Sequence, residues 1–276
     1  MKSIKLILGS ALFFLIGTVA CNKDQNTDED TSQSAFEVEA NMYSDELEKS
    51  ADAVTFDKNG SGNGPFSGNS SECVEITISY PEGGSFPKVI TIDYGEVNCE
   101  VRPNLFKRGQ IIVTITDSIV NLGAQRIVTF EEFYINDHAV TGTKTITNLG
   151  ENAEGYLVFD INNSFSIGEW SRQATGSKIW VEGFDTLEFD DNVFLLTGTS
   201  STTRPNEIVI NRTITEPLRI DRSCAYITEG IVSIQWNGNN AIIDYGVGSC
   251  DDIAIITRNG QEFEIDLDNF RCRRML

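Results

Sequence analysis

Four cysteines stand in two pairs with the same spacing. Cys73 and Cys99 are 26 residues apart, and so are Cys224 and Cys250. In an oxidising compartment this pattern predicts two disulfides, Cys73–Cys99 and Cys224–Cys250. A thiolate metal site and free buried thiols are the alternatives, but a metal site usually contains Cys-x-x-Cys pairs or nearby histidines. Cys272 has no counterpart and is either free or competes for one of the four.

Cys21 predicts a different chemistry. Lys2 and Lys5 form a short cationic region, residues 4–16 form an apolar run, and Thr18 begins a small-residue approach to Cys21. This is the pattern of a cleaved signal peptide. A cysteine at the cleavage point is similar to a bacterial lipobox, although Thr18 stands where Leu is usual. We therefore expect a signal peptide over 1–20 and acyl chains on Cys21 that bind the lipid bilayer. The alternative is a buried cysteine behind an ordinary signal peptide.

Two copies of an Asp-Tyr-Gly motif could carry acid chemistry. Asp93 and Asp244 each precede a Tyr and a Gly. Paired carboxylates that flank a sugar are the machinery of glycoside hydrolysis, so a carboxylate hydrolase is one hypothesis. The favoured interpretation is structural: the Gly permits a turn, the Tyr packs on a sheet face, and the Asp accepts hydrogen bonds from nearby backbone N–H groups.

Three tryptophans and one histidine complete the candidate residues. Trp170, Trp180 and Trp236 could stack on sugar rings, which makes surface glycan capture the main alternative function, although a β core uses tryptophan routinely. His138 is the only histidine, which argues against a Ser-His-Asp triad and a multi-histidine zinc site. The sequence predicts no catalytic residue, no metal and no cofactor.

The elements that must position these residues are mostly strands. From 73 onward, short segments rich in Ile, Val and Thr alternate apolar with polar residues between Gly and Asn clusters. Asn148-Leu149-Gly150, Asn237-Gly238 and Asn259-Gly260 predict hairpin turns. We expect an all-β fold of antiparallel sheets, meander- or sandwich-like, with one short N-terminal helix.

The β region contains an internal duplication. Residues 73–117 align without a gap on 224–268 at an offset of 151, with identities that include both cysteines, Ile-Asp-Tyr-Gly and Gly-Gln. We expect each copy to form three or four antiparallel strands. The all-β domain then covers 73–276, with the two copies flanking a hairpin-rich region over 118–223.

The segment before the β domain divides into three parts. Residues 21–34 are polar and predict a disordered acidic tether. Apolar residues near helical spacing over 35–54 predict an amphipathic helix that lies on a sheet and is broken near Ser44. The Gly- and Asn-rich remainder, to 71, predicts a loop. Its start, Asp57 to Gly62, is similar to half of an EF-hand calcium loop but has Gly68 where the bidentate Glu belongs.

Charge limits the partners. The chain of 276 residues has a net charge of −20, and removal of Lys2 and Lys5 with the signal peptide makes it −22. Because nucleic acids and anionic lipids are bound through basic surfaces, we expect no nucleic-acid partner. The excess of acid is interpreted as a device for solubility.

One resemblance covers nearly the whole mature chain. Its motifs are Thr141-Gly142-Thr143, Trp180-Val181-Glu182-Gly183, Leu196-Thr197-Gly198 and Asp244-Tyr245-Gly246-Val247-Gly248 before Cys250. In these motifs the chain resembles uncharacterised lipoproteins of Bacteroidota. The resemblance implies an outer-membrane location, on the periplasmic or surface face, and no activity. Asp-Ser/Thr-aliphatic tripeptides at Ser118 and Thr186 are similar to O-glycosylation sites of these bacteria.

The sequence therefore predicts a lipid-anchored envelope protein that acts as a binding or structural module. It predicts no enzyme. The expected partners are the lipid bilayer, through the acyl chains on Cys21, and a glycan or another envelope protein.

Overall fold

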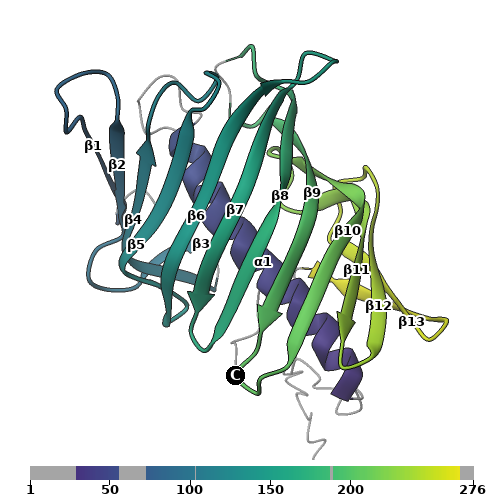
Figure 1. The fold of residues 1–276 in the computed structure, drawn as a ribbon. Coiled ribbons are helices and arrows are strands. Elements are labelled where there is room, and N and C mark those ends of the chain that lie inside the picture. The colour runs from purple at the N-terminus through teal and green to yellow at the C-terminus, as the bar shows by residue number, and fades with distance from the viewer. Residues whose placement is uncertain (1–28, 56–72, 103, 187–188, 268–276) are drawn as a thin grey trace, which may run out of the picture.

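One helix and one large antiparallel sheet make up the fold in the computed structural model (Figure 1). The structure describes residues 29–55, 73–102, 104–186 and 189–267. The elements are α1 (Glu29–Thr55), β1 (Glu75–Ser79), β2 (Lys88–Asp93), β3 (Cys99–Arg102), β4 (Leu105–Ile115), β5 (Gln125–Ile135), β6 (His138–Glu151), β7 (Leu157–Ile167), β8 (Trp170–Glu182), β9 (Val193–Thr203), β10 (Val209–Asp221), β11 (Ile227–Trp236), β12 (Asn239–Val247), β13 (Ile253–Arg258) and β14 (Gln261–Asp266).

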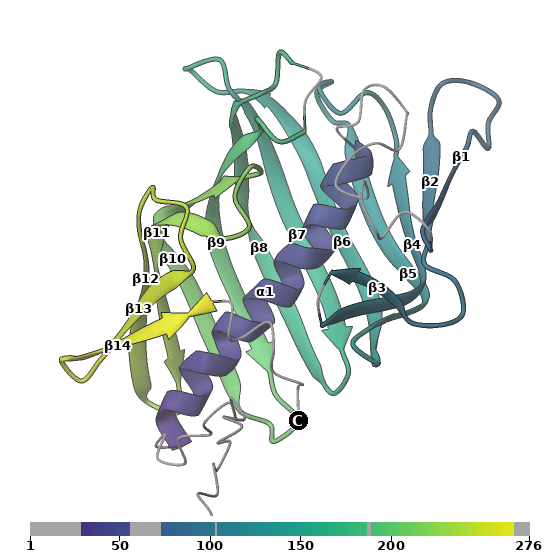
Figure 2. The same ribbon diagram turned by 180° about the vertical axis from the view of Figure 1, so that it is seen from behind.

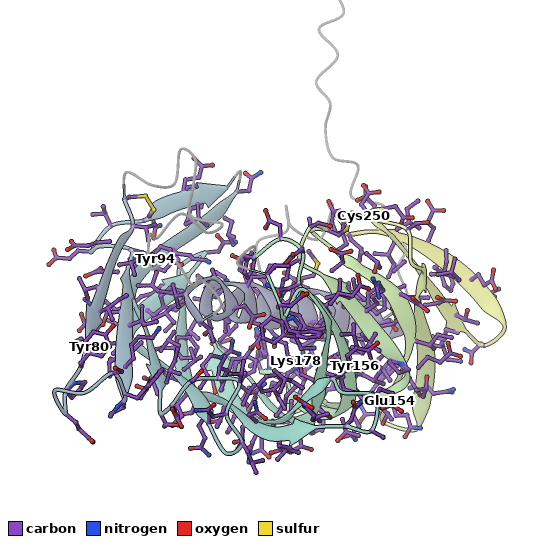
Figure 3. All side chains as sticks on the ribbon, turned by 90° about the horizontal axis from the view of Figure 1, so that it is seen from above. Tyr80, Tyr94, Glu154, Tyr156, Lys178 and Cys250 are labelled. Atoms are coloured by element: carbon purple, nitrogen blue, oxygen red, sulfur yellow. A yellow bond between two sulfur atoms is a disulfide. The ribbon has the colours of Figure 1, made fainter. Side chains whose placement is uncertain are left out.

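The strands form a meander. Each pairs antiparallel with its neighbours in the order β1-β2-β4-β5-β6-β7-β8-β9-β10-β11-β12-β13-β14, and β3 pairs with β4 beside this path. The sheet curves into a trough, and α1 lies along its concave side (Figures 2 and 3). The predicted all-β fold with a single N-terminal helix is confirmed, and the helix covers the face that a second sheet covers in a sandwich.

The helix is longer than the sequence pattern suggested. It begins at Glu29 rather than at 35, and it continues to Thr55 without the break expected near Ser44. Two hydrophobic stripes explain its position. Tyr43, Leu47 and Ala51 pack against β2, β4 and β5, whereas Val38 packs against the sheet from β10 to β14. A third cluster, around Phe159 and Phe194, fills the middle of the sheet.

The two sequence copies form the two ends of the sheet. The first supplies β1 to β4 and the second supplies β11 to β14, so each copy forms four strands, where three or four were expected. They differ at the shared Gly-Gln pair. Gly109 lies inside the continuous strand β4, at a register shift against β5, whereas Gly260 forms the turn between β13 and β14. Similar sequences therefore meet different neighbours at the two ends.

Two of the three predicted hairpins are present. Asn237-Gly238 joins β11 to β12 and Asn259-Gly260 joins β13 to β14, all four with positive φ. The third prediction is wrong, because Asn148 to Gly150 lie within β6 at a register shift against β7. Gly150 N donates a hydrogen bond to Asn148 Oδ1 at 2.6 Å, so this side chain stabilises a bulge instead of a turn.

Candidate functional site

The side of α1 that faces the middle of the sheet is acidic. Glu37, Asp45, Glu48 and Asp52 recur at spacings of three to eight residues, which places them along one face of a helix. Glu37 and Asp52 are completely buried, and Asp45 and Glu48 are largely covered. An acidic helix face usually meets solvent, so these carboxylates need cationic partners inside the protein.

The concave face of the sheet supplies those partners. Lysines and arginines occupy inward positions on five strands and the segment after β10, and each is nearly or fully buried. They are Lys107 on β4, Arg126 on β5, Lys144 on β6, Arg172 and Lys178 on β8, Arg212 on β10, and Arg222. A protein of net charge −20 thus has a basic interior face, and part of its acid is committed to internal ion pairs rather than to solubility.

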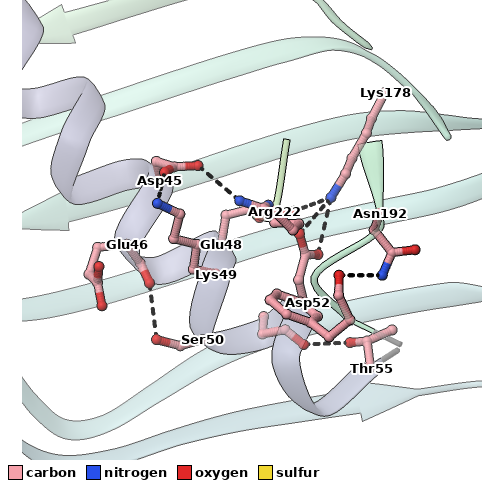
Figure 4. Close-up of polar contacts among 12 residues, drawn as sticks. Asp45, Glu46, Glu48, Lys49, Ser50, Asp52, Thr55, Lys178, Asn192 and Arg222 are labelled. Atoms are coloured by element: carbon pink, nitrogen blue, oxygen red, sulfur yellow. Dashed lines mark hydrogen bonds and ion pairs between the residues drawn. The ribbon is translucent and has the colours of Figure 1, made fainter. Parts of the chain in front are cut away.

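Asp52 is the centre of this network (Figure 4). Its carboxylate accepts hydrogen bonds from Arg126, from Arg222 and, at 3.0 and 3.1 Å, from Lys178 Nζ. Glu48 also binds Arg126 and Lys178. The ion pairs join α1 to β5, β8 and the end of β10, and so they fix how the helix lies across the strands.

Burial and the neighbouring charges oppose each other in setting the pKa values of these groups. Burial raises the pKa of Asp52, but Lys178, Arg222 and Arg126 outweigh it and keep the pKa below its usual value. For Asp45, burial is outweighed by Lys49 and Arg222, and its pKa is about 2. Asp45 and Asp52 are therefore charged at neutral pH.

Two cations of the interior face, Lys144 and Arg212, have too little negative charge near them to offset the effect of burial. Burial lowers the pKa of Lys144 and of Arg212, and the nearby carboxylates do not make up the loss. Arg212 Nε lies 3.9 Å from Glu37 Oε1, which Arg172 Nη2 already occupies at 2.6 Å. One carboxylate therefore serves two buried arginines.

A cavity of about 90 Å³ lies between α1 and strands β6 to β10. Its floor is a block of four small residues that face one another across two strands, because Ala174 and Gly176 on β8 pair with Ser200 and Gly198 on β9. The absence of larger side chains at these four positions leaves the space open. The charged groups around it are Lys144, Arg172, Lys178, Arg212 and Arg222 as cations, and Asp45 and Glu48 as carboxylates.

The repeated Asp-Tyr-Gly motifs have the structural role. Asp93 Oδ1 accepts a hydrogen bond from Gly95 N at 2.7 Å, and Asp244 Oδ1 accepts one from Gly246 N at 2.8 Å. Both glycines have positive φ, and both tyrosines are buried in the core. Asp93 on β2 and Asp244 on β12 lie at opposite ends of the sheet, so they do not flank a common site. The two-carboxylate arrangement of a glycoside hydrolase is not formed by this pair.

The three tryptophans do not form a sugar-stacking surface. Trp170, Trp180 and Trp236 are each at most 3% exposed, and each lies in a different core cluster. Stacking on a sugar requires an exposed ring face. These residues are therefore core residues, and the glycan-capture alternative loses the feature that suggested it.

Both predicted disulfides are present. Cys73 bonds to Cys99, and Cys224 bonds to Cys250. Each joins a buried cysteine, Cys99 or Cys224, to an exposed one. The first bond ties the segment before β1 to β3, and the second closes the chain between the end of β10 and the start of β13.

Other sequence predictions lie away from this site or outside the described residues. Cys21, Cys272 and the EF-hand-like segment from Asp57 fall outside them. Ser118 lies between β4 and β5 and Thr186 between β8 and β9, both half-buried. Within 29–267, less the gaps, no group of three His, Cys, Asp or Glu side chains is placed to hold a metal ion. In the same part of the chain no helix has the length and apolar character needed to cross a membrane.

Sequence reasoning missed the basic face and the cavity. A signal was present: Arg126 is two residues from the buried Val128, Lys178 is two residues from Trp180, and Arg172 is two residues from Trp170. Residues two apart in a strand share a face, so these cations had to lie on the core side. The spacing of Ala174 and Gly176 between two such cations indicated an unfilled position.

No protein-family model, no curated protein and no solved structure matches the chain.

Proposed function

We propose that this chain is a lipid-anchored, non-catalytic binding protein of the bacterial cell envelope, and that its ligand lies in the cavity between α1 and β6–β10. The observation that carries the binding role is that cavity: about 90 Å³, floored by small residues and surrounded by seven charged side chains. Ligand sites are typically concave places with a few convergent polar groups.

The surrounding structure suits binding without large motion. The sheet is continuous on both sides of the cavity, and the Asp52 network fixes the helix that covers it. Disulfides near both ends of the sheet add rigidity. A site held in this way is organised before its ligand arrives, which lowers the entropic cost of binding.

The envelope location is supported by the sequence before the helix. A signal-like segment ends at Cys21, and α1 begins only eight residues later, at Glu29. The resemblance to Bacteroidota lipoproteins and the two disulfides are consistent with an outer-membrane protein that folds in an oxidising compartment. Acyl chains on Cys21 would hold the sheet close to the lipid surface.

Replacement of Cys21 is expected to release the protein from the membrane. In cells that process lipoproteins, Cys21→Ser should move the protein from the membrane fraction to the soluble fraction, because no acyl chain can then be attached. The measurement is fractionation followed by mass spectrometry of the N-terminus. Cys272→Ser is the matched control and should stay with the membrane. A Cys21→Ser protein that remains in the membrane fraction contradicts the anchor.

Filling the cavity is expected to abolish binding while the fold remains. Ala174→Leu adds three carbon atoms to the cavity floor. A thermal-shift screen of small anionic, neutral and cationic compounds should find ligands that stabilise the unsubstituted protein and have at least tenfold less effect on the variant. Gln173→Leu, an exposed position on the same strand that does not line the cavity, is the control. If no compound class distinguishes Ala174→Leu from the control, the binding role is wrong.

A further inference from the structure

The residues that line the cavity include three buried polar side-chain atoms with no hydrogen-bond partner in the described structure, one of which is Nε of Arg222. Nη2 of Arg212 and Oγ of Ser200 line the cavity region, are shielded from solvent, and donate or accept no hydrogen bond within the described structure. A buried donor without a partner is costly, because it has lost its hydrogen bonds to water. A ligand with acceptor oxygens, seated in this cavity, would give both atoms a partner.

The two residues are direct neighbours. Ser200 on β9 pairs with Arg212 on β10, and on its other side it pairs with Ala174 on β8. Directly paired residues have side chains on the same face, with Cβ atoms about 5 Å apart. Arg172 stands two residues from Ala174 on β8 and therefore faces the same side. The space above Ala174 is therefore bordered by Arg172 on the same strand, by Ser200 on β9 and by Arg212 on β10.

The balance of charge around this position is positive. Six buried cations, Arg126, Lys144, Arg172, Lys178, Arg212 and Arg222, are paired among four helix carboxylates, Glu37, Asp45, Glu48 and Asp52. Two positive charges are therefore in excess among these ten groups, before Lys49 beside Asp45 is counted. Buried charge without compensation opposes folding, and an anion in the cavity would remove that penalty.

The space is large enough for an anion. A volume of 90 Å³ corresponds to about six to nine water positions, which is ample for a tetrahedral oxyanion. Guanidinium groups bind the oxygens of such anions through paired, charge-assisted hydrogen bonds. The excess of two charges favours a dianion over a monoanionic carboxylate or a phosphodiester lipid head group.

We infer that Arg172, Ser200 and Arg212 form a binding site for a doubly charged tetrahedral oxyanion: sulfate, phosphate, or the phosphoryl group of a phosphomonoester. This inference rests on the proposed binding function and names its ligand class. Arg212 Nη2 donates to one oxygen and Ser200 Oγ donates to another. Arg172, held by Glu37 and by Thr202 Oγ1 at 2.9 Å, closes the site from β8.

The test uses the purified full-length protein with sodium sulfate, sodium phosphate and sodium acetate, at ionic strength held constant with sodium chloride. We expect sulfate and phosphate to bind saturably in calorimetry and to raise the melting temperature, with acetate at least tenfold weaker. Arg212→Met should weaken sulfate binding about ten- to hundredfold. Arg219→Met, on the same strand but in an exposed pair with Glu182, should leave it unchanged.

Stability in the absence of anion separates a binding role from a purely structural one. If Arg212 serves the ligand, Arg212→Met should be as stable as the unsubstituted protein or more so, because an undercompensated buried charge is removed. If Arg212 only supports the fold, the variant should be less stable. Ser200→Ala gives a second, milder variant, which should weaken sulfate binding while the protein stays folded.

Each outcome decides the inference. No saturable sulfate or phosphate binding, equal binding of acetate, or unchanged binding by Arg212→Met each overturns it. Glycerol phosphate that binds more tightly than inorganic phosphate supports the site with a phosphomonoester as ligand, and the reverse order supports the free ion. If oxyanions fail but other compounds still distinguish Ala174→Leu from its control, the binding function stands and only this ligand class is wrong.

Discussion

Asp52→Asn is expected to destabilise the protein by about 3–5 kcal/mol, because it leaves three buried cations without their central anion. Arg126, Lys178 and Arg222 all bind this carboxylate, and Asp52 is fully buried. The amide cannot supply the negative charge that these groups need. Urea unfolding followed by the fluorescence of the buried tryptophans measures the loss.

The control for Asp52→Asn is an exposed carboxylate on the opposite side of the sheet. Asp160→Asn on β7 should change the free energy of unfolding by less than about 0.5 kcal/mol. A double variant, Asp52→Leu with Arg222→Met, should lose less than the sum of the two single changes, since it removes a cation together with its partner. If Asp52→Asn costs no more than Asp160→Asn, the buried network does not stabilise the docked helix.

Removal of either disulfide is expected to cost about 3.5 kcal/mol. Both bonds link cysteines 26 residues apart, and the loop entropy of the unfolded chain depends on that separation. The prediction concerns Cys73→Ser with Cys99→Ser, and Cys224→Ser with Cys250→Ser. Urea unfolding of both double variants and of the chain that lacks all four cysteines measures the effect.

The two costs should be equal and additive. The bonds lie near opposite ends of the sheet, so the variant without either bond should lose about 7 kcal/mol. Cys272→Ser is the control and should change stability little if that cysteine takes no part in either bond. The two disulfides close loops of the same length. If the two double variants lost very different amounts of unfolding free energy, loop entropy would not be the main source of the stabilisation.

The strands and turns could be predicted because their signals are local. Alternation over Thr143 to Thr147 and over Val232 to Trp236 places one face inward whatever the neighbouring strand is. Asn237-Gly238 and Asn259-Gly260 form their turns because Asn and Gly tolerate positive φ. The predicted turn at Asn148-Leu149-Gly150 is not formed, because β6 continues to pair with β7 before and after the bulge at these residues. That choice depends on a neighbouring strand and not on the tripeptide.

In the helix too, one feature could be predicted from local spacing and another could not. Its apolar stripe through Leu47 and Ala51 was readable from spacing alone. Its acidic stripe was not, because Glu48 and Asp52 look like a solvated face until the sheet that covers them is known. The pairs they form join residues 74 to 170 positions apart in the chain.

The sequence by itself determined the class of fold, the two cysteine pairs and the turn role of Asp93 and Asp244, because each follows from periodicity, equal spacing or the geometry of a few consecutive residues. Only the tertiary structure decided that the sheet is a single trough, that the acid of α1 is buried against a basic face, and that Arg172, Ser200 and Arg212 meet around one cavity. These features arise where distant segments pack together. The free energy of a buried charge depends on those distant neighbours, and no local pattern contains them.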